Sequence, residues 1–373
     1  MHLIVAFLIA IAAYGRAFGE TVWHLGGDTG IAPAANILSV ETDGDLVYLG
    51  VGGVSTANGG IMRYLPRSGR LTQIYDAGRG CSVTGLRKSS RGIFFLESCS
   101  AQRSIKLLSL DTLTAATVSQ LQQCVSPWDM VVEPDGFIVS CMESYEIIKV
   151  DQSGNRYSLW KMRGSPWCSP QANPFGLMGI RSIERSGDSF FVASNSCNMV
   201  WRFNESMTTA QAVAGVAWST TVGSITEGLS NANTVSLPAY AVRMLQGKLF
   251  IGMGMHGLVV VDPDTSRILR AVRPPVAPVN MQDRYAIGNS IASDGEWVWV
   301  SGLRALMAWR NEFFQATPTP APPTETPTLA PTETPTIQPT DTPTSVPSTA
   351  TPTATSVSRA CELARELLLE VCK

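Results

Sequence analysis

The residues best suited to covalent chemistry are eight cysteines in a chain of 373 residues. Six of them form three pairs, in which the first member precedes a short apolar run and the second ends the next run. These pairs are Cys81 with Cys99, Cys124 with Cys141, and Cys168 with Cys197. The two places are neighbours in an antiparallel hairpin, so we predict three disulfides, one in each hairpin. The alternative is six buried free thiols in a reducing compartment.

Metal and nucleophile chemistry have few candidates. There is no Cys-x-x-Cys motif, and only His24 and His256 lie beyond the first nineteen residues, so a zinc site of the usual Cys/His spacing is not predicted. No Gly-x-Ser-x-Gly elbow occurs in a suitable context. The 28 basic and 30 acidic residues leave a net charge of −2, which gives no electrostatic reason to bind nucleic acid or an acidic membrane. We expect no catalytic residue, metal or cofactor.

The elements that must position these residues form a repeat. Six times, two apolar strand-like runs flank a glycine-containing turn, and a third run, in most cases followed by a fourth, comes after them. The turn glycines are Gly44, Gly92, Gly136, Gly187, Gly247 and Gly295. Four short strands in each unit of about 45 to 50 residues are typical of a propeller blade. The sequence therefore predicts an all-β, six-bladed β-propeller over residues 20–314, and the 45% hydrophobic content is ample for its core.

Ring closure is indicated near the start of this region. The segment TVWHLGG (21–27) resembles the fourth strands of other units but precedes any first strand. We expect it to complete the last blade, which would tie both ends of the ring together. The alternative is that the segment FFQAT (313–317) supplies that strand.

The units resemble NHL-type propeller repeats, in which a Pro-aromatic-Gly entry leads to a hairpin and then to an Asn-containing third strand. The resemblance rests on PWDMVVEPDGFIVSCMESYEIIKVDQSGN, NPFGLMGIRSIERSGDSFFVASNSCNMVWRF and LPAYAVRMLQGKLFIG, and it covers residues 21–311 loosely. It implies the fold more than the function.

The entries of the inner strands would face the channel mouth, and we take the residues there as candidate ligand-binding positions. They are Thr84, Trp128, Asp129, Phe175, Tyr240 and Asn289. Enzymes with similar propellers imply two alternatives. A peptidyl-hydroxyglycine lyase would need a histidine-bound zinc, for which two histidines are too few. A gluconolactonase-like hydrolase would need a calcium or zinc held by Glu, Asn and Asp, and one Asp with one Asn does not make such a site.

The two ends of the chain differ from the middle. Residues 1–19 resemble a secretory signal peptide, so we predict an extracellular protein. Residues 315–358 form a Thr/Pro-rich stalk in which Pro-Thr-x-x recurs, and it lacks the apolar residues of a core. We predict O-glycosylation of this stalk; the alternative is an unmodified flexible linker. The candidate threonines are Thr324, Thr328, Thr332, Thr336, Thr340 and Thr344.

Residues 359–373 are predicted to form a short amphipathic helix that joins copies of the chain or docks it to a partner. Cys361 and Cys372 lie too far apart on a straight helix to bridge each other, which favours intermolecular disulfides; the alternative is local unwinding and a bridge between the two. Asn204 begins the one standard N-glycosylation sequon.

Together these features predict a secreted, non-enzymatic propeller module for extracellular binding or structural assembly, with an extracellular protein or glycan as its partner and with self-association through the C-terminal helix. No membrane span is predicted. The alternative is a gluconolactonase-like, metal-dependent hydrolase that uses the channel.

Overall fold

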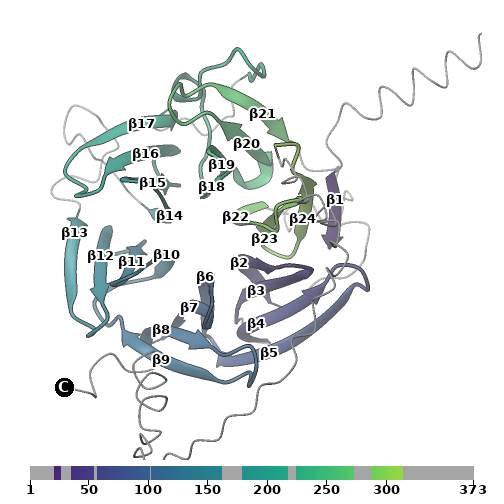
Figure 1. Cartoon of the computed structure of the whole chain (residues 1–373), viewed down its shortest axis with the longest axis vertical. Coiled ribbons are helices and arrows are strands. Elements are labelled where there is room, and N and C mark those ends of the chain that lie inside the picture. The colour runs from purple at the N-terminus through teal and green to yellow at the C-terminus, as the bar shows by residue number, and fades with distance from the viewer. Residues whose placement is uncertain are drawn as a thin grey trace, which may run out of the picture. The chain divides into compact units, whose positions relative to one another are not determined.

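A computed structural model describes residues 21–26, 35–53, 57–100, 102–161, 179–216, 224–272 and 287–313. These ranges consist of antiparallel strands arranged around one axis, as in a β-propeller (Figure 1). Two short 3-10 helices, Ala232–Thr234 and Gly254–His256, are the helical elements within them. In the part of the chain that the structure describes, no helix is long and apolar enough to cross a membrane. The predicted signal peptide, stalk and C-terminal helix lie outside the described residues.

Four of the sheets have four strands each. One contains β10 (Pro127–Glu133), β11 (Gly136–Cys141), β12 (Glu146–Asp151) and β13 (Arg156–Lys161). The next contains β14 (Ile180–Ser186), β15 (Ser189–Ser194), β16 (Met199–Asn204) and β17 (Ala210–Gly215). A third contains β18 (Ala241–Leu245), β19 (Lys248–Gly252), β20 (Leu258–Val261) and β21 (Ile268–Val272). The fourth, which we call the closing sheet, contains β22 (Ile287–Ser293), β23 (Trp297–Gly302), β24 (Leu306–Arg310) and β1 (Thr21–Leu25).

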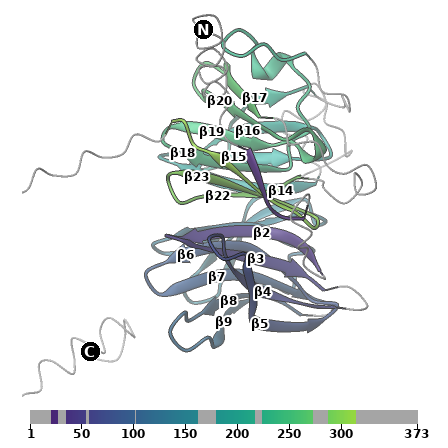
Figure 2. The ribbon, with the colours of Figure 1, turned by 90° about the vertical axis from the view of Figure 1, so that its right-hand side faces the viewer.

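The remaining strands form one eight-stranded sheet. Its first half contains β2 (Asn36–Asp43), β3 (Leu46–Gly52), β4 (Asn58–Leu65) and β5 (Arg70–Arg79). Its second half contains β6 (Ser82–Ser89), β7 (Gly92–Cys99), β8 (Gln102–Leu108) and β9 (Ala115–Gln120). A single residue pair, Gly52 with Ser82, joins the two halves. The halves lie next to each other around the axis (Figure 1 and Figure 2).

The predicted hairpin turns are present, and all six turn glycines have positive φ. Gly136 shows that the turn is not the only requirement. A Cβ at Gly136, where φ is 152°, would lie 2.1 Å from the carbonyl oxygen of Val150 on the neighbouring strand. Glycine is therefore needed there both for the backbone conformation and for the close approach of two strands.

The expected ring closure is confirmed. Strand β1 pairs antiparallel with β24 at the outer edge of the closing sheet, with Thr21 opposite Trp309 and Val22 opposite Ala308. This sheet therefore combines strands from both ends of the propeller region. The strands nearest the axis also contact one another in the order β2, β6, β10, β14, β18, β22 and back to β2.

Apolar side chains fill the spaces between neighbouring groups of strands. Phe94 on β7 and Phe137 on β11 meet with ring centroids 5.1 Å apart, and Phe250 on β19 meets Trp309 on β24 at 6.1 Å. Each fully buried aromatic or aliphatic side chain contributes about 1.5–3 kcal/mol through removal of its surface from water. Packing between strand groups thus fixes the innermost strands, which carry the polar residues described next.

Candidate functional site

The innermost strands each place a polar or charged side chain near the axis, where it is buried or partly buried. These residues are Glu41 on β2, Arg87 on β6, Asp129 on β10, Glu184 on β14, Arg243 on β18 and Asn289 on β22. Such groups are normally stable in a protein interior only when they are paired.

Arg87 joins two of the acidic groups. Its Nη2 lies 2.9 Å from Asp129 Oδ1 and 3.5 Å from Glu184 Oε2. The same nitrogen donates to the carbonyl of Ile183 at 3.3 Å. The side chain of Arg87 is only 10% exposed, so these contacts operate with little solvent screening.

Arg243 extends the network across the axis. Its Nη1 lies 3.5 Å from Glu184 Oε2, and its Nη2 lies 3.3 Å from Glu41 Oε2. Burial alone would lower the pKa of Arg243, but Glu184, Glu41 and Asp129 outweigh that effect and raise it. Arg243 is therefore held firmly in its charged form.

Three carboxylates share two guanidinium groups, so one negative charge is in excess. Burial raises the pKa of Glu184 despite the opposing influence of Arg243 and Arg87, so protonation of this carboxyl would relieve the excess. Asp129 is also stabilised by neutral donors: its Oδ2 accepts hydrogen bonds from Ser182 Oγ at 2.8 Å and from the Ile183 amide at 3.1 Å. The network thus binds β2, β6, β10, β14 and β18 to one another, and we call it the axial ion-pair network.

A different arrangement occurs where these strands begin. The guanidinium of Arg181, on β14, lies between two aromatic rings, with its carbon 4.2 Å from the ring centroid of Trp128 and 4.9 Å from that of Tyr240. Among the described residues no carboxylate pairs with Arg181, and its buried Nε has no hydrogen-bond partner. Burial lowers the pKa of Arg181 to about 10, so the group is still a cation at neutral pH. We call Trp128, Arg181 and Tyr240 the arginine sandwich.

The sequence-based candidates fall into different places. Trp128 and Tyr240 belong to the arginine sandwich, and Asp129 belongs to the axial ion-pair network. Thr84 and Asn289 have structural contacts: Thr84 Oγ1 donates to the carbonyl of Pro127 at 3.1 Å, and Asn289 Nδ2 donates to that of Ile37 at 3.1 Å. Phe175 lies outside the described residues.

Sequence reasoning missed the other charged members of both groups. These are Glu41, Arg87, Arg181, Glu184 and Arg243. The available signal was the recurrence of a charged residue a few positions before the turn glycine in successive repeats. A charge in such a strand needs a partner, and the partner here comes from another repeat.

Two predicted disulfides are present. Cys81 bonds to Cys99 and Cys124 bonds to Cys141, each across the hairpin that the pair flanks. Cys197 is also disulfide-bonded, while Cys168 lies outside the described residues, so the third pairing stays a prediction. Cys361, Cys372 and the candidate stalk threonines likewise lie outside them.

Asn204, the predicted N-glycosylation site, ends β16 at the turn before β17. Its Nδ2 donates to Ser206 Oγ and to Thr208 Oγ1, both at 2.9 Å. A glycan on this nitrogen would have to replace at least one of these exposed hydrogen bonds. Glycosylation at this position stays a prediction.

No protein-family model and no curated protein sequence matches the chain. Solved structures do share its fold. An auxiliary nutrient binding protein from Bacteroides thetaiotaomicron aligns with a TM-score of 0.55 and 8% identity, covering 78% of this chain and 76% of that chain. A luciferin-regenerating enzyme aligns with a TM-score of 0.53 and 9% identity, covering 80% and 98%.

Virginiamycin B lyase from Staphylococcus aureus also aligns, with a TM-score of 0.51 and 13% identity, over 78% of this chain and 99% of the lyase chain. These similar structures include a binding protein and enzymes. At such low identity the likeness establishes the β-propeller fold and nothing about activity.

Proposed function

We propose that this chain is a secreted, non-enzymatic propeller module that binds an extracellular ligand near the axis, with Arg181 recognising an anionic group. The observation that carries the proposal is the unequal pairing of charges. The axial carboxylates are engaged by guanidinium groups, whereas Arg181 has no anionic partner among the described residues. A desolvated cation without a partner is costly, and an incoming anion would remove that cost.

The arginine sandwich suits a planar or tetrahedral anion. The rings of Trp128 and Tyr240 both lie close to the guanidinium carbon, and the Nε–H donor has no partner among the described residues. Arginine binds carboxylate, phosphate and sulfate groups through two parallel hydrogen bonds in the plane of its guanidinium. The rings also restrict the side chain, which lowers the entropy lost on binding.

The axial ion-pair network favours a structural role over catalysis. A carboxylate that serves as general base or metal ligand needs a free lone pair, yet Asp129 accepts hydrogen bonds on both oxygens and also faces Arg87. Freeing one partner of a buried ion pair costs about 3–5 kcal/mol. A hydrolase that used Asp129, Glu184 or Glu41 would have to overcome that cost before each turnover.

The runner-up is a gluconolactonase-like, metal-dependent hydrolase, and the similarity to a luciferin-regenerating enzyme and a lyase keeps an enzyme in consideration. The purified protein should be assayed with lactone and ester substrates in the presence of calcium or zinc, together with metal analysis. We expect no turnover above the uncatalysed rate. Stoichiometric metal with measurable turnover would replace the binding proposal by the hydrolase.

We further propose that the propeller has six blades of the NHL type. Four four-stranded sheets, an eight-stranded sheet whose halves meet at a single residue pair, and the closed order of contacts around the axis support this count. Two hairpin disulfides support an oxidising, extracellular location.

We propose that the stalk and the C-terminal helix together hold the propeller in a multimeric assembly. A glycosylated stalk would hold it away from a surface, and a C-terminal helix with Cys361 and Cys372 would join several copies, which raises avidity without a strong single site. Intact mass tests the stalk, since a mass equal to that of the bare polypeptide would refute glycosylation. Non-reducing electrophoresis tests the helix, since a purely monomeric band would argue against covalent assembly.

The anion site can be tested with group probes. We would label the protein with fluorotryptophan, assign the Trp128 resonance through a Trp128→Phe variant, and titrate sodium acetate, phosphate and sulfate against sodium chloride at equal ionic strength. We expect a saturable shift of this resonance with at least one oxyanion. Arg181→Gln should abolish the shift and Arg181→Lys should retain part of it, because lysine keeps the charge without the planar donors.

A matched control is Arg79→Gln, which removes an exposed arginine at the end of β5. This variant should titrate like the wild type. The anion proposal fails if none of the three oxyanions gives a saturable shift, or if Arg79→Gln weakens the response as much as Arg181→Gln does.

A further inference from the structure

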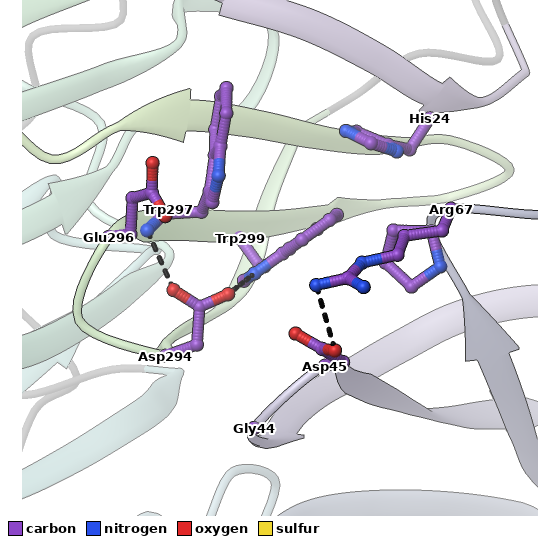
Figure 3. A pocket seen from close by; sticks show the side chains of 9 residues that line it. His24, Gly44, Asp45, Arg67, Asp294, Glu296, Trp297 and Trp299 are labelled. Carbon is purple, nitrogen blue, oxygen red and sulfur yellow. Dashed lines mark hydrogen bonds and ion pairs between the residues drawn. The ribbon is translucent and has the colours of Figure 1, made fainter.

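A cavity lies at the seam where the closing sheet meets the first half of the eight-stranded sheet. It has a volume of about 410 Å³, and we call it the seam pocket (Figure 3). Its lining comes from β1, from β23 and from the turns of three hairpins. The residues are His24, Gly44, Asp45, Pro66, Arg67, Asp294, Glu296, Trp297 and Trp299.

Asp294 is fixed between two tryptophans of this pocket. One carboxylate oxygen accepts the backbone N–H of Trp297 at 2.7 Å, and the other accepts Nε1–H of Trp299 at 2.9 Å (Figure 3). Both donors are neutral. Each carboxylate oxygen retains a further lone pair, so the group can accept another hydrogen bond without moving.

The charges around Asp294 do not balance it. Asp45 pairs with Arg67 at 3.1 Å, and Glu296 pairs with Arg310 at 3.5 Å. Within the described ranges no arginine, lysine or histidine forms an ion pair with Asp294, so the pocket has a net negative charge. His24 does not offset it at neutral pH, since burial lowers the pKa of this histidine below 6.5.

The two indoles provide different parts of an aromatic wall. Trp299 is only 3% exposed and packs against His24 with ring centroids 4.6 Å apart and ring planes tilted by 58°, so its role is to position Asp294. Trp297 is half-buried and keeps part of its ring open to the pocket. A partly open aromatic ring and an unpaired carboxylate that line the same pocket can together attract an ammonium or guanidinium group.

We propose that the seam pocket binds an organic cation, with the cationic group in contact with the Trp297 ring and the Asp294 carboxylate. The cation is either a small quaternary amine or a basic side chain of a polypeptide, since both present the same chemistry. The inference does not depend on the arginine sandwich, because the two sites share no residue and select opposite charges.

The test uses two cations and one neutral probe. Choline represents a quaternary amine, lysine with blocked α-amino and carboxyl groups represents a polypeptide side chain, and methyl glucoside represents a neutral ligand of aromatic pockets. Binding is followed through the fluorotryptophan resonance of Trp297, assigned with a Trp297→Phe variant. A saturable shift with either cation and none with the glucoside is expected, and the preferred cation identifies the source of the ligand.

Variants separate the contributions of the two groups. Asp294→Asn keeps an acceptor for one N–H but removes the charge, and it should weaken the affinity of the preferred cation about fivefold or more. Affinity, measured calorimetrically, should fall from tryptophan to Trp297→Phe and further to Trp297→Leu, because phenylalanine has the weaker aromatic face and leucine has none. Circular dichroism and thermal unfolding establish that each variant is folded.

A matched control is Asp188→Asn, which alters an exposed aspartate in the equivalent turn between β14 and β15. This variant and Arg181→Gln should bind the cation as the wild type does, so failure of the anion site leaves this result unaffected. The proposal is overturned if neither cation binds, if the glucoside binds as well as the cations, or if Asp294→Asn has no more effect than Asp188→Asn.

Discussion

The guanidinium of Arg87 on β6 lies 2.9 Å from the carboxylate of Asp129 on β10, and both side chains are about nine-tenths buried. Two neighbouring strand groups are therefore joined by an ion pair as well as by apolar packing. Asp129 also accepts the amide of Ile183 on β14, which brings a third group into the same contact. This pair is accordingly the centre of the axial ion-pair network.

Removing one partner of this pair should be strongly destabilising. Arg87→Met leaves Asp129 without its arginine partner and Glu184 with Arg243 alone, so we expect the free energy of unfolding to fall by about 3–5 kcal/mol. Urea unfolding measures the change. The control is Arg67→Met, which removes an ion pair with Asp45 whose side chains are 86% and 73% exposed, and it should cost less than about 1 kcal/mol. Equal losses in the two variants would show that the buried axial pair contributes no more to stability than the exposed pair does.

The hairpin disulfides give a second stability prediction. Replacing Cys81 and Cys99 together by alanine should lower the free energy of unfolding by about 2–4 kcal/mol, because the bond closes a segment with a sequence separation of 18. Denaturant unfolding under non-reducing conditions measures this loss. Addition of a reductant should destabilise the wild type more than the double variant, which retains fewer disulfides. A double variant as stable as the wild type would contradict the expected contribution.

The sequence could predict what depends on local spacing. The pairing of Cys81 with Cys99 follows from the symmetry of one hairpin, and the position of β1 follows from its likeness to other outermost strands. The axial ion-pair network could not be predicted in this way. Glu41 and Arg243 are 202 residues apart and meet only because the ring closes, so their contact depends on the orientation of whole strand groups around the axis.

The same distinction applies to the candidate sites. Trp128 and Tyr240 were identified because they stand at strand entries, but Arg181 between them was not, since cation–π stacking joins residues from three strand groups or their entries. The seam pocket is even harder to predict from the sequence. It is formed by turns from the two ends of the ring. In the sequence, a residue such as Asp294 indicates only a hairpin turn, because aspartate commonly accepts a backbone N–H within such a turn, as it does here from Trp297.

Because β1 closes the ring, we expect a single substitution in this strand to lower the free energy of unfolding substantially. Leu25, at the end of β1, is fully buried in the core between the closing sheet and the first half of the eight-stranded sheet. Leu25→Ala should lower the free energy of unfolding by about 2–5 kcal/mol through the lost burial and the cavity that remains. Val118→Ala on β9 is the control, since Val118 is 39% exposed and should change stability little. A negligible effect of Leu25→Ala would mean that β1 is not required for closure.

His24 predicts how the stability of the seam depends on pH. Burial lowers the pKa of its imidazole below 6.5, its ordinary value, so between these two values the unfolded chain binds more protons than the folded chain. Stability should therefore be full above pH 6.5 and should fall as the pH drops through the lowered pKa. Tyr64 and Trp299 contact the ring, and the charged groups on the same pocket are Asp45, Arg67, Asp294 and Glu296.

The contribution of His24 is isolated by comparing two proteins. His24→Gln keeps a polar side chain of similar size but does not titrate, so its unfolding free energy should decline less than that of the wild type between neutral pH and about pH 5. Urea unfolding at a series of pH values measures both slopes, and the acidic residues that titrate at lower pH affect the two proteins alike. If the two slopes coincide, the imidazole has the same proton affinity in the folded and unfolded chains. If the wild type is instead stabilised on acidification relative to the variant, the carboxylates of the pocket outweigh burial and the sign of the prediction is wrong.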